Sequence, residues 1–404
     1  MVYEYDGKER LFTGHSGRIF ILLTVIWLCI SLTSRLLPPL LPVIMEDLAI
    51  TAFLAGLALT VERIVRAGVE YPSGRFADQL TRTSVLVVCV SIVILSLIIL
   101  SISFSYVLFV IAIIVFGLGR GMYTPPTRAL LSDIFLAKRG RAFGFNMMGS
   151  EFAGILGAGL AIVIVTYATW RAAFLPLALL LIPLLVGFYL LSREPIEFQS
   201  VDLGVQETGL RIFGDPSLRW LLIVYSLYVL AASGVSTFLP TFLIDVHGVS
   251  FAFASSAFAL LYVVGFFSKP TSGYLSDIFP RSLVAAAALI VGAGGLALLV
   301  SAPYELLAIG GVIIYAFGYR GISPALHAFM MDRFSDETMG GDFGAMRTIY
   351  LMVGSLGPAY AGLAGSVLGF VPAFTSFLVF YIIGAGILLW FSIRGWPTVQ
   401  PSQA

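Results

Sequence analysis

Charged residues are scarce in this sequence, and this restricts the surroundings in which the chain can fold. Only 11% of its 404 residues are Asp, Glu, Lys or Arg, whereas 59% are hydrophobic. A soluble protein has roughly 25% charged residues, so this chain cannot cover a water-facing surface and is expected to face the lipid bilayer. The net charge of +1, without any basic tract, gives no sign of nucleic acid as a partner.

Residues that carry most enzyme chemistry are also few. The chain has three histidines and two cysteines. Cys29 and Cys89 lie inside apolar runs, so no disulfide framework is implied. We find no metal-ligand spacing, no Ser/His/Asp arrangement and no phosphate-binding loop. We therefore expect a protein that is not an enzyme and that has neither a metal site nor a cofactor.

Long hydrophobic runs dominate the sequence instead. A membrane-spanning helix needs about 20 mostly apolar residues, and twelve such segments are predicted. They are 18–43, 52–76, 83–103, 105–135, 140–166, 172–192, 217–243, 250–276, 281–302, 304–334, 341–368 and 371–395. The longest interruption, 193–216, is rich in charge. It is predicted to link two six-helix bundles, 18–192 and 217–395, with tails at 1–17 and 396–404.

Lysine and arginine are distributed unevenly over the predicted connections. With the N-terminus in the cytoplasm, nearly all of them fall on the cytoplasmic side, and Arg171 stands almost alone on the other. Positive charge favours cytoplasmic loops. Because the number of spans is even, both termini are expected in the cytoplasm. The protein is expected to be a multi-pass monomer in the cytoplasmic membrane.

The two halves of the sequence share a series of residues at a nearly constant offset. The matched positions are Gly74/Gly273, Asp78/Asp277, Arg82/Arg281 and Asp133/Asp332 at an offset of 199 residues, and Arg120/Arg320, Gly154/Gly354 and Gly157/Gly357 at 200. Several matches in the same order are hard to obtain by chance. They indicate an internal repeat.

These residues resemble motifs of the major facilitator superfamily. The element Gly74-x-x-x-Asp78-x-x-x-Arg82 is similar to the signature of that family's loop between helices 2 and 3, with Gln79 and Thr81 replacing a basic residue and a glycine. The resemblance implies an all-α fold of 12 transmembrane helices in two bundles related by a pseudo-two-fold axis. It also implies that helices 1, 4, 7 and 10 line a central cavity and that transport proceeds by alternating access.

The resemblance further implies a gate at the cytoplasmic ends of the helices. The corresponding aspartate in the family caps helix 11, which here begins near 340–342, because a helix N-terminus favours a carboxylate. Arg82 is expected to pair with Asp133, and the second copy to repeat this pair. The predicted gating residues are Gly74, Asp78, Arg82, Asp133, Gly273, Asp277, Arg281 and Asp332. The alternative is that these charges are ordinary loop residues.

Several ionisable residues fall inside the predicted spans, where such groups are costly and usually face a cavity or a partner. They are Arg35, Glu62, Arg63, Arg66, Glu70, Arg120, Glu151, Lys269, Arg320, His327 and Arg347. Cations outnumber carboxylates, which favours an anionic substrate. We expect Arg35, Arg120 and Arg320 to bind it, with polar contacts from Tyr123 and Tyr319. The alternative for Arg120 is a structural ion pair, for example with Glu151.

Other intramembrane groups are candidates for ion coupling. Glu70 and Lys269 each stand four residues before a motif glycine, so a salt bridge between the halves is predicted. Glu151 and His327 are further coupling candidates, because burial and neighbouring charge can move a carboxyl and histidine begins near neutrality. Packing alone is the alternative for His327. A local pair between Glu62 and Arg66, four residues apart, is also predicted.

Together these features favour a secondary transporter that moves a small, carboxylate-like organic anion, coupled to protons or another ion in symport. The alternative is a proton-coupled exporter of amphipathic compounds, which would depend on Glu70 or Glu151.

Overall fold

The computed structural model describes residues 11–79, 81–135, 138–192, 215–333 and 339–395. Every regular element in these residues is helical, and eleven helical segments are long and apolar enough to cross a membrane. The remaining long helix, α2 (Ala52–Gln79), carries Glu62, Arg63, Arg66 and Glu70. The predicted all-α membrane fold is therefore confirmed.

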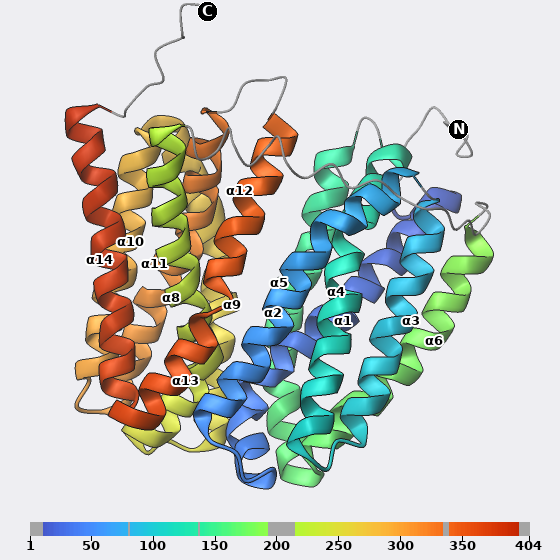
Figure 1. Cartoon of the computed structure of the whole chain (residues 1–404), viewed down its shortest axis with the longest axis horizontal. Coiled ribbons are helices and arrows are strands. Elements are labelled where there is room, and N and C mark those ends of the chain that lie inside the picture. Colours follow the sequence, from blue (N-terminus) through green and yellow to red (C-terminus); the bar gives the residue numbers. More distant parts are fainter. Residues whose placement is uncertain (1–10, 80, 136–137, 193–214, 334–338, 396–404) are drawn as a thin grey trace, which may run out of the picture. The chain divides into compact units, whose positions relative to one another are not determined.

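The helices form two compact units (Figure 1). Unit 1 contains the described residues of 1–50 and 61–203, and unit 2 those of 51–60 and 204–404. Besides most of α2, unit 1 holds α1 (Gly14–Asp47), α3 (Arg82–Ser101), α4 (Tyr106–Ile134), α5 (Arg139–Tyr167), the short helix η1 (Trp170–Ala173) and α6 (Phe174–Leu191). The predicted linker and tails lie mostly outside the described residues, so their boundaries stay predictions.

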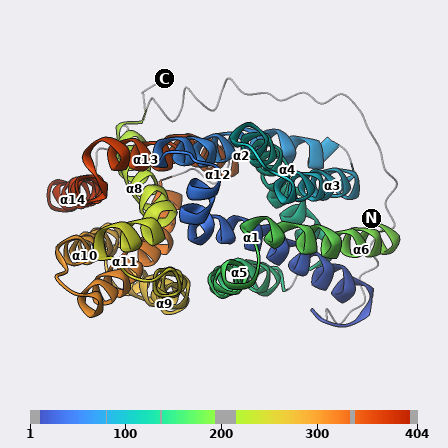
Figure 2. The same cartoon turned by 90° about the horizontal axis from the view of Figure 1, so that it is seen from below.

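Unit 2 repeats this order of helices. Its elements are α8 (Pro216–His247), α9 (Phe251–Ile278), α10 (Arg281–Ser301), α11 (Glu305–Met331), α12 (Met339–Gly354), α13 (Gly357–Leu368) and α14 (Phe370–Arg394). The same helix contacts recur in both units: α1 packs on α5 and α6, as α8 packs on α12, α13 and α14 (Figure 2). Likewise, α3 packs on α4 and α6, as α10 packs on α11 and α14.

Polar residues fix several helix ends. Asp215 caps α8 by accepting a hydrogen bond from the Ser217 backbone N–H at 2.7 Å, and Pro216 follows at the first helical position. Ser105 and Ser250 cap α4 and α9 in the same way. At the other end of α8, Gly248 adopts a left-handed φ of 66°, which suits glycine. These residues mark where α4, α8 and α9 begin and where α8 ends.

The predicted span 341–368 is present as one segment long enough to cross a membrane, Phe343–Leu368, but its helix is interrupted between Gly354 and Gly357. Pro358 has no N–H, so it cannot donate the helical hydrogen bond to the Gly354 carbonyl four residues earlier. The Ser233 hydroxyl of α8 donates to this oxygen instead, at 2.5 Å. A Cβ on Gly357 would lie 2.2 Å from the Leu230 backbone oxygen. Glycine therefore lets α8 approach this break.

Candidate functional site

Arg120 on α4 forms an ion pair with Glu62 on α2. Its Nη1 lies 3.1 Å from Glu62 Oε1, and the two side chains are only 12% and 5% exposed. The helices approach closely because Gly117 and Gly121 face α2. A Cβ at these positions would lie 2.6 Å from the backbone oxygen of Glu62 or Arg66, respectively. Glu62 thus pairs across two helices, whereas Arg66 on its own helix was the predicted partner.

Two more guanidinium groups belong to this region of unit 1. Arg35 on α1 and Arg66 on α2 repel Arg120 electrostatically, and Glu62 attracts it. On α5, Gly157 allows α1 to approach, because a Cβ there would lie 3.2 Å from the Arg35 carbonyl carbon. Three guanidinium groups thus lie in one region of unit 1, and an anionic ligand would reduce their mutual repulsion.

Tyr123, also on α4, is held in the core of unit 1. Its side chain is fully buried and its ring stacks on Trp27, with centroids 5.7 Å apart and planes at 4°. Its hydroxyl donates to the Leu23 carbonyl oxygen at 2.6 Å. This geometry favours a packing role between α1 and α4 over the substrate contact expected from the sequence.

Arg320 on α11 has quite different surroundings in unit 2. Its guanidinium carbon lies 4.5 Å from the ring centroid of Tyr262 on α9 and 4.8 Å from that of Tyr319. The residue is only 7% exposed. Gly265 on α9 makes room for the stem, since a Cβ there would lie 2.9 Å from Arg320 Cγ. Aromatic ring faces attract a cation, so the two tyrosines hold the guanidinium in place.

A layer of further tyrosines supports this arrangement. Tyr228 on α8 donates a hydrogen bond to the Tyr319 carbonyl oxygen at 3.1 Å. Tyr315 stacks on Tyr319 with centroids 5.5 Å apart, and its hydroxyl lies 3.5 Å from that of Tyr381 on α14. The ring of Tyr319 is therefore held by stacking on Tyr315, and its backbone carbonyl by the hydrogen bond from Tyr228.

His327 lies two turns further along α11. Its Nδ1 is 2.7 Å from the Ser323 carbonyl oxygen, which can only accept, so Nδ1 carries the hydrogen. Nε2 then accepts from the Tyr350 hydroxyl at 3.4 Å. The ring packs at 74° to Tyr225, with centroids 5.4 Å apart. Both nitrogens of the predicted coupling histidine are thus engaged in hydrogen bonds.

The other coupling candidates are distributed over both units. Glu70 and Lys269 are half-buried and belong to unit 1 and unit 2, respectively, so their predicted salt bridge stays a prediction. Glu151 on α5 is also half-buried. Within the described residues, no group of three or more His, Cys, Asp and Glu side chains could hold a metal ion.

The predicted gate pairs are present in both units. Arg82 pairs with Asp133, and Arg281 Nη1 lies 2.5 Å from Asp332 Oδ1 and 3.0 Å from the Ala328 carbonyl oxygen. Asp277 is exposed, and the side chain of Asp78 lies outside the described part of the structure. A Cβ on Gly74 would meet its nearest atom, on Pro125, only at 3.8 Å. The role of these residues as a gate stays a prediction.

Sequence reasoning missed the partners that hold the two arginines. Glu62 was assigned to a neighbour on its own helix, and Gly265 was not singled out. Tyr262 was one of many tyrosines without a distinguishing feature. These three residues contact an arginine on a different helix. Such contacts can be recognised only once the rotation of α2 or α9 about its own axis is known.

Two repeated six-helix bundles with buried arginines define this protein as a multi-pass helical membrane protein with internal symmetry. The sequence matches the profile of the Major Facilitator Superfamily over residues 23–358, and the chain belongs to this family.

Two curated relatives are named as transporters. The chain is 21% identical to the hexuronate transporter of Bacillus subtilis (strain 168) over 347 residues, covering 80% of this chain and 81% of the relative. It is 25% identical to the probable sulfoacetate transporter SauU of Cupriavidus necator over 353 residues, covering 80% of each.

Among solved structures, the fold is similar to that of a bacterial homologue of the human lysosomal transporter Spinster. The TM-score is 0.83 at 16% sequence identity, and the match covers 97% of this chain and 100% of the other.

Proposed function

We propose that this protein transports a small organic anion with a carboxylate-like group across the cytoplasmic membrane by alternating access. The main support is the presence of arginine side chains within the membrane-spanning helices of each unit, with Arg120 near Arg35 and Arg66 and with Arg320 between two tyrosine rings. Arginine binds carboxylates in two parallel hydrogen bonds, which gives both affinity and orientation. The names of the two relatives, which refer to a hexuronate and to sulfoacetate, are consistent with this substrate class.

Within this proposal, Arg35, Arg120 and Arg320 bind the anion and Tyr319 orients Arg320. Transport is symport coupled to protons or another ion, with Glu70, Lys269, Glu151 and His327 as the coupling candidates. Both termini lie in the cytoplasm, and the paired charges Arg82–Asp133 and Arg281–Asp332 belong to the cytoplasmic gate. The distribution of Lys and Arg over the loops supports this orientation.

Uptake by proteoliposomes tests the proposal. Purified protein is reconstituted and supplied with labelled glucuronate, labelled sulfoacetate or, as an uncharged control, labelled glucose, with and without an inward proton gradient. We expect uptake of an anion that the gradient accelerates, and no uptake of glucose. Uptake of glucose alone would contradict the anion proposal. Efflux of an amphipathic drug against its gradient, without anion uptake, would favour the exporter instead.

A further inference from the structure

Arg171 of unit 1 lies between the ends of α1 and α3, on the side of the unit away from Asp133. We call the position that its guanidinium occupies the seat. Arg171 Nη2 lies 2.6 Å from Asp47 Oδ2 at the end of α1, and Arg171 Nε donates to the Ser103 carbonyl oxygen at 2.8 Å. The guanidinium also lies 4.9 Å from the ring centroid of Phe104. Its side chain is only 11% exposed. A carboxylate, a carbonyl oxygen and a ring face thus surround one cation.

The repeat identifies the counterpart of this seat in unit 2. At an offset of 200 residues, α1 and α8 end at Asp47 and His247, and α3 and α10 end at Ser101 and Ser301. The aromatic pair beside Arg171 is also repeated. Trp170 and Phe174 lie 6.1 Å apart at 77°, and Phe370 and Phe374 lie 6.5 Å apart at 84°.

The same offset therefore matches Asp47, Ser103 and Phe104 with His247, Pro303 and Tyr304. Arg171 is matched by Val371, whose short apolar side chain cannot fill a seat for a cation.

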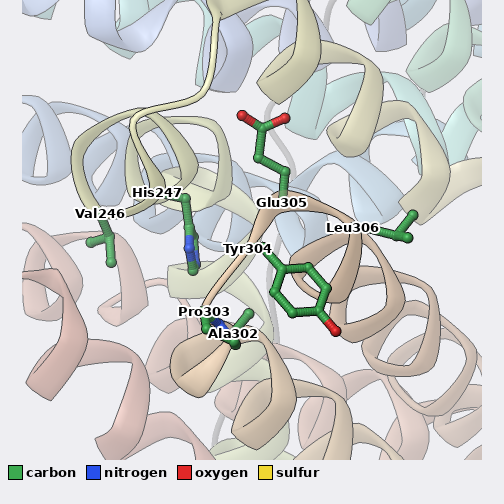
Figure 3. Close-up of a pocket in the computed structure, with 7 residues that line it drawn as sticks. All are labelled: Val246, His247, Ala302, Pro303, Tyr304, Glu305 and Leu306. Carbon is green, nitrogen blue, oxygen red and sulfur yellow. The ribbon is translucent and has the colours of Figure 1, made fainter.

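A hollow of about 690 Å³ lies at this place in unit 2 (Figure 3). It is lined by Val246, His247, Ala302, Pro303, Tyr304, Glu305 and Leu306. Figure 3 shows His247 at the end of α8, Tyr304 just before α11 and Glu305 at the first position of α11. The counterparts of Asp47, Ser103 and Phe104, which surround Arg171 in unit 1, thus line a hollow in unit 2.

The groups around the hollow suit a cation. His247 Nε2 lies 3.0 Å from the Leu299 carbonyl oxygen, so Nε2 carries the hydrogen and Nδ1 of the neutral ring is an acceptor. In unit 1 the Ser103 hydroxyl satisfies the matching carbonyl of Ile99 at 2.7 Å; Pro303 has no such hydroxyl, and His247 takes its place.

The remaining groups that line the hollow also favour a cation over an anion. Pro303 supplies a carbonyl oxygen and no N–H, and Tyr304 supplies an exposed ring face. Glu305 contributes a negative charge, and neither lysine nor arginine is among the lining residues. An anion would find few donors here, whereas a cation would find acceptors, a ring face and a carboxylate.

We propose that this hollow binds an organic cation that carries a guanidinium or primary ammonium group, in the position that Arg171 occupies in unit 1. The cation is either a free solute or the ammonium of an ethanolamine lipid headgroup. The site lies within unit 2 and does not depend on Arg120 or Arg320. It can therefore be tested whether or not the protein transports anions.

Binding of propylguanidinium to the full-length protein in detergent tests this proposal, with propylurea as the uncharged control of the same shape. We expect saturable binding of propylguanidinium only, measured by calorimetry. In Val371→Arg a tethered guanidinium fills the seat, and binding is lost, whereas Val371→Leu binds as the original protein does. Equal binding of both probes, no binding of either, or unchanged binding by Val371→Arg would overturn the proposal.

A second variant keeps the test decisive if Val371→Arg does not fold. Glu305→Gln retains the shape of the side chain but removes its charge, and we expect its Kd for propylguanidinium to rise about tenfold. An unchanged Kd would contradict the role of the carboxylate.

The two sources of the cation are then distinguished in nanodiscs. If phosphatidylethanolamine occupies the seat, propylguanidinium binds weakly in its presence and tightly in phosphatidylcholine alone. If the natural ligand is a solute, the two lipids give the same Kd.

Discussion

The two arginines at matching positions of the repeat are held by different physical means. In unit 1, Arg120 forms a buried ion pair with Glu62 on the neighbouring helix. In unit 2, Arg320 is held between the rings of Tyr262 on the neighbouring helix and Tyr319 on its own. The repeat thus preserves the cation and the pairing of helices, while the residue that holds the cation has changed from an acid to an aromatic ring.

This difference matters because an ion pair and a ring contact respond differently to substitution. Loss of Glu62 leaves a buried positive charge without its counter-charge, whereas loss of one ring face weakens the attraction on Arg320 by a smaller amount.

Removal of Glu62 should have the largest effect on stability. In Glu62→Leu, Arg120 is left buried beside Arg35 and Arg66 without its ion-pair partner, and loss of one partner of a buried pair costs about 3–5 kcal/mol. Thermal unfolding of the purified protein measures this loss. The double variant Glu62→Leu/Arg120→Met removes both charges and should recover most of it. A double variant as unstable as the sum of the two single variants would show that the pair is not the relevant interaction.

An alanine at position 265 should displace Arg320. Its Cβ would lie 2.9 Å from Arg320 Cγ, and overpacking of this kind costs about 1–3 kcal/mol. We expect a lower melting temperature and weaker anion uptake.

Gly273→Ala, on the same helix α9, is the matched control. A Cβ there meets no atom within 4 Å among the described residues, so the melting temperature should not fall. An equal fall in the two variants would mean that the displacement of Arg320 does not decide the outcome.

Changes at Tyr262 should have a smaller, graded effect. Tyr262→Phe retains a ring face for Arg320, and Tyr262→Leu removes it, so only leucine loses the cation–π attraction of about 0.5–2 kcal/mol. Anion affinity and melting temperature should therefore rank the original protein and phenylalanine together, above leucine. If phenylalanine is as weak as leucine, the hydroxyl rather than the ring is the important group.

Much of this architecture could be predicted from the sequence, because it depends on order along the chain. Apolar runs located the helices. The expected pair of Arg82 with Asp133 is present, and the offset of 199 residues correctly located its repeat, Arg281 with Asp332. Contacts between helices were harder, because spacing along one helix shows only its own neighbours. For that reason Glu62 was assigned to Arg66, and Tyr123 to a substrate rather than to the Leu23 carbonyl. The interruption of the helix before Pro358 could not be predicted, because it depends on a hydrogen bond from Ser233, which is distant in sequence.

The affinity of the purified protein for glucuronate is the most direct test of the central claim that the matched arginines bind an organic anion. We compare Arg320→Gln and Arg120→Gln with Arg394→Gln, whose arginine is exposed at the end of α14, after confirming that each variant is folded. The account predicts that Arg320→Gln raises Kd about tenfold or more, since hydrogen bonds to charged groups are strong. It predicts a similar loss for Arg120→Gln and no change for Arg394→Gln. Unchanged affinity in both matched variants would contradict it.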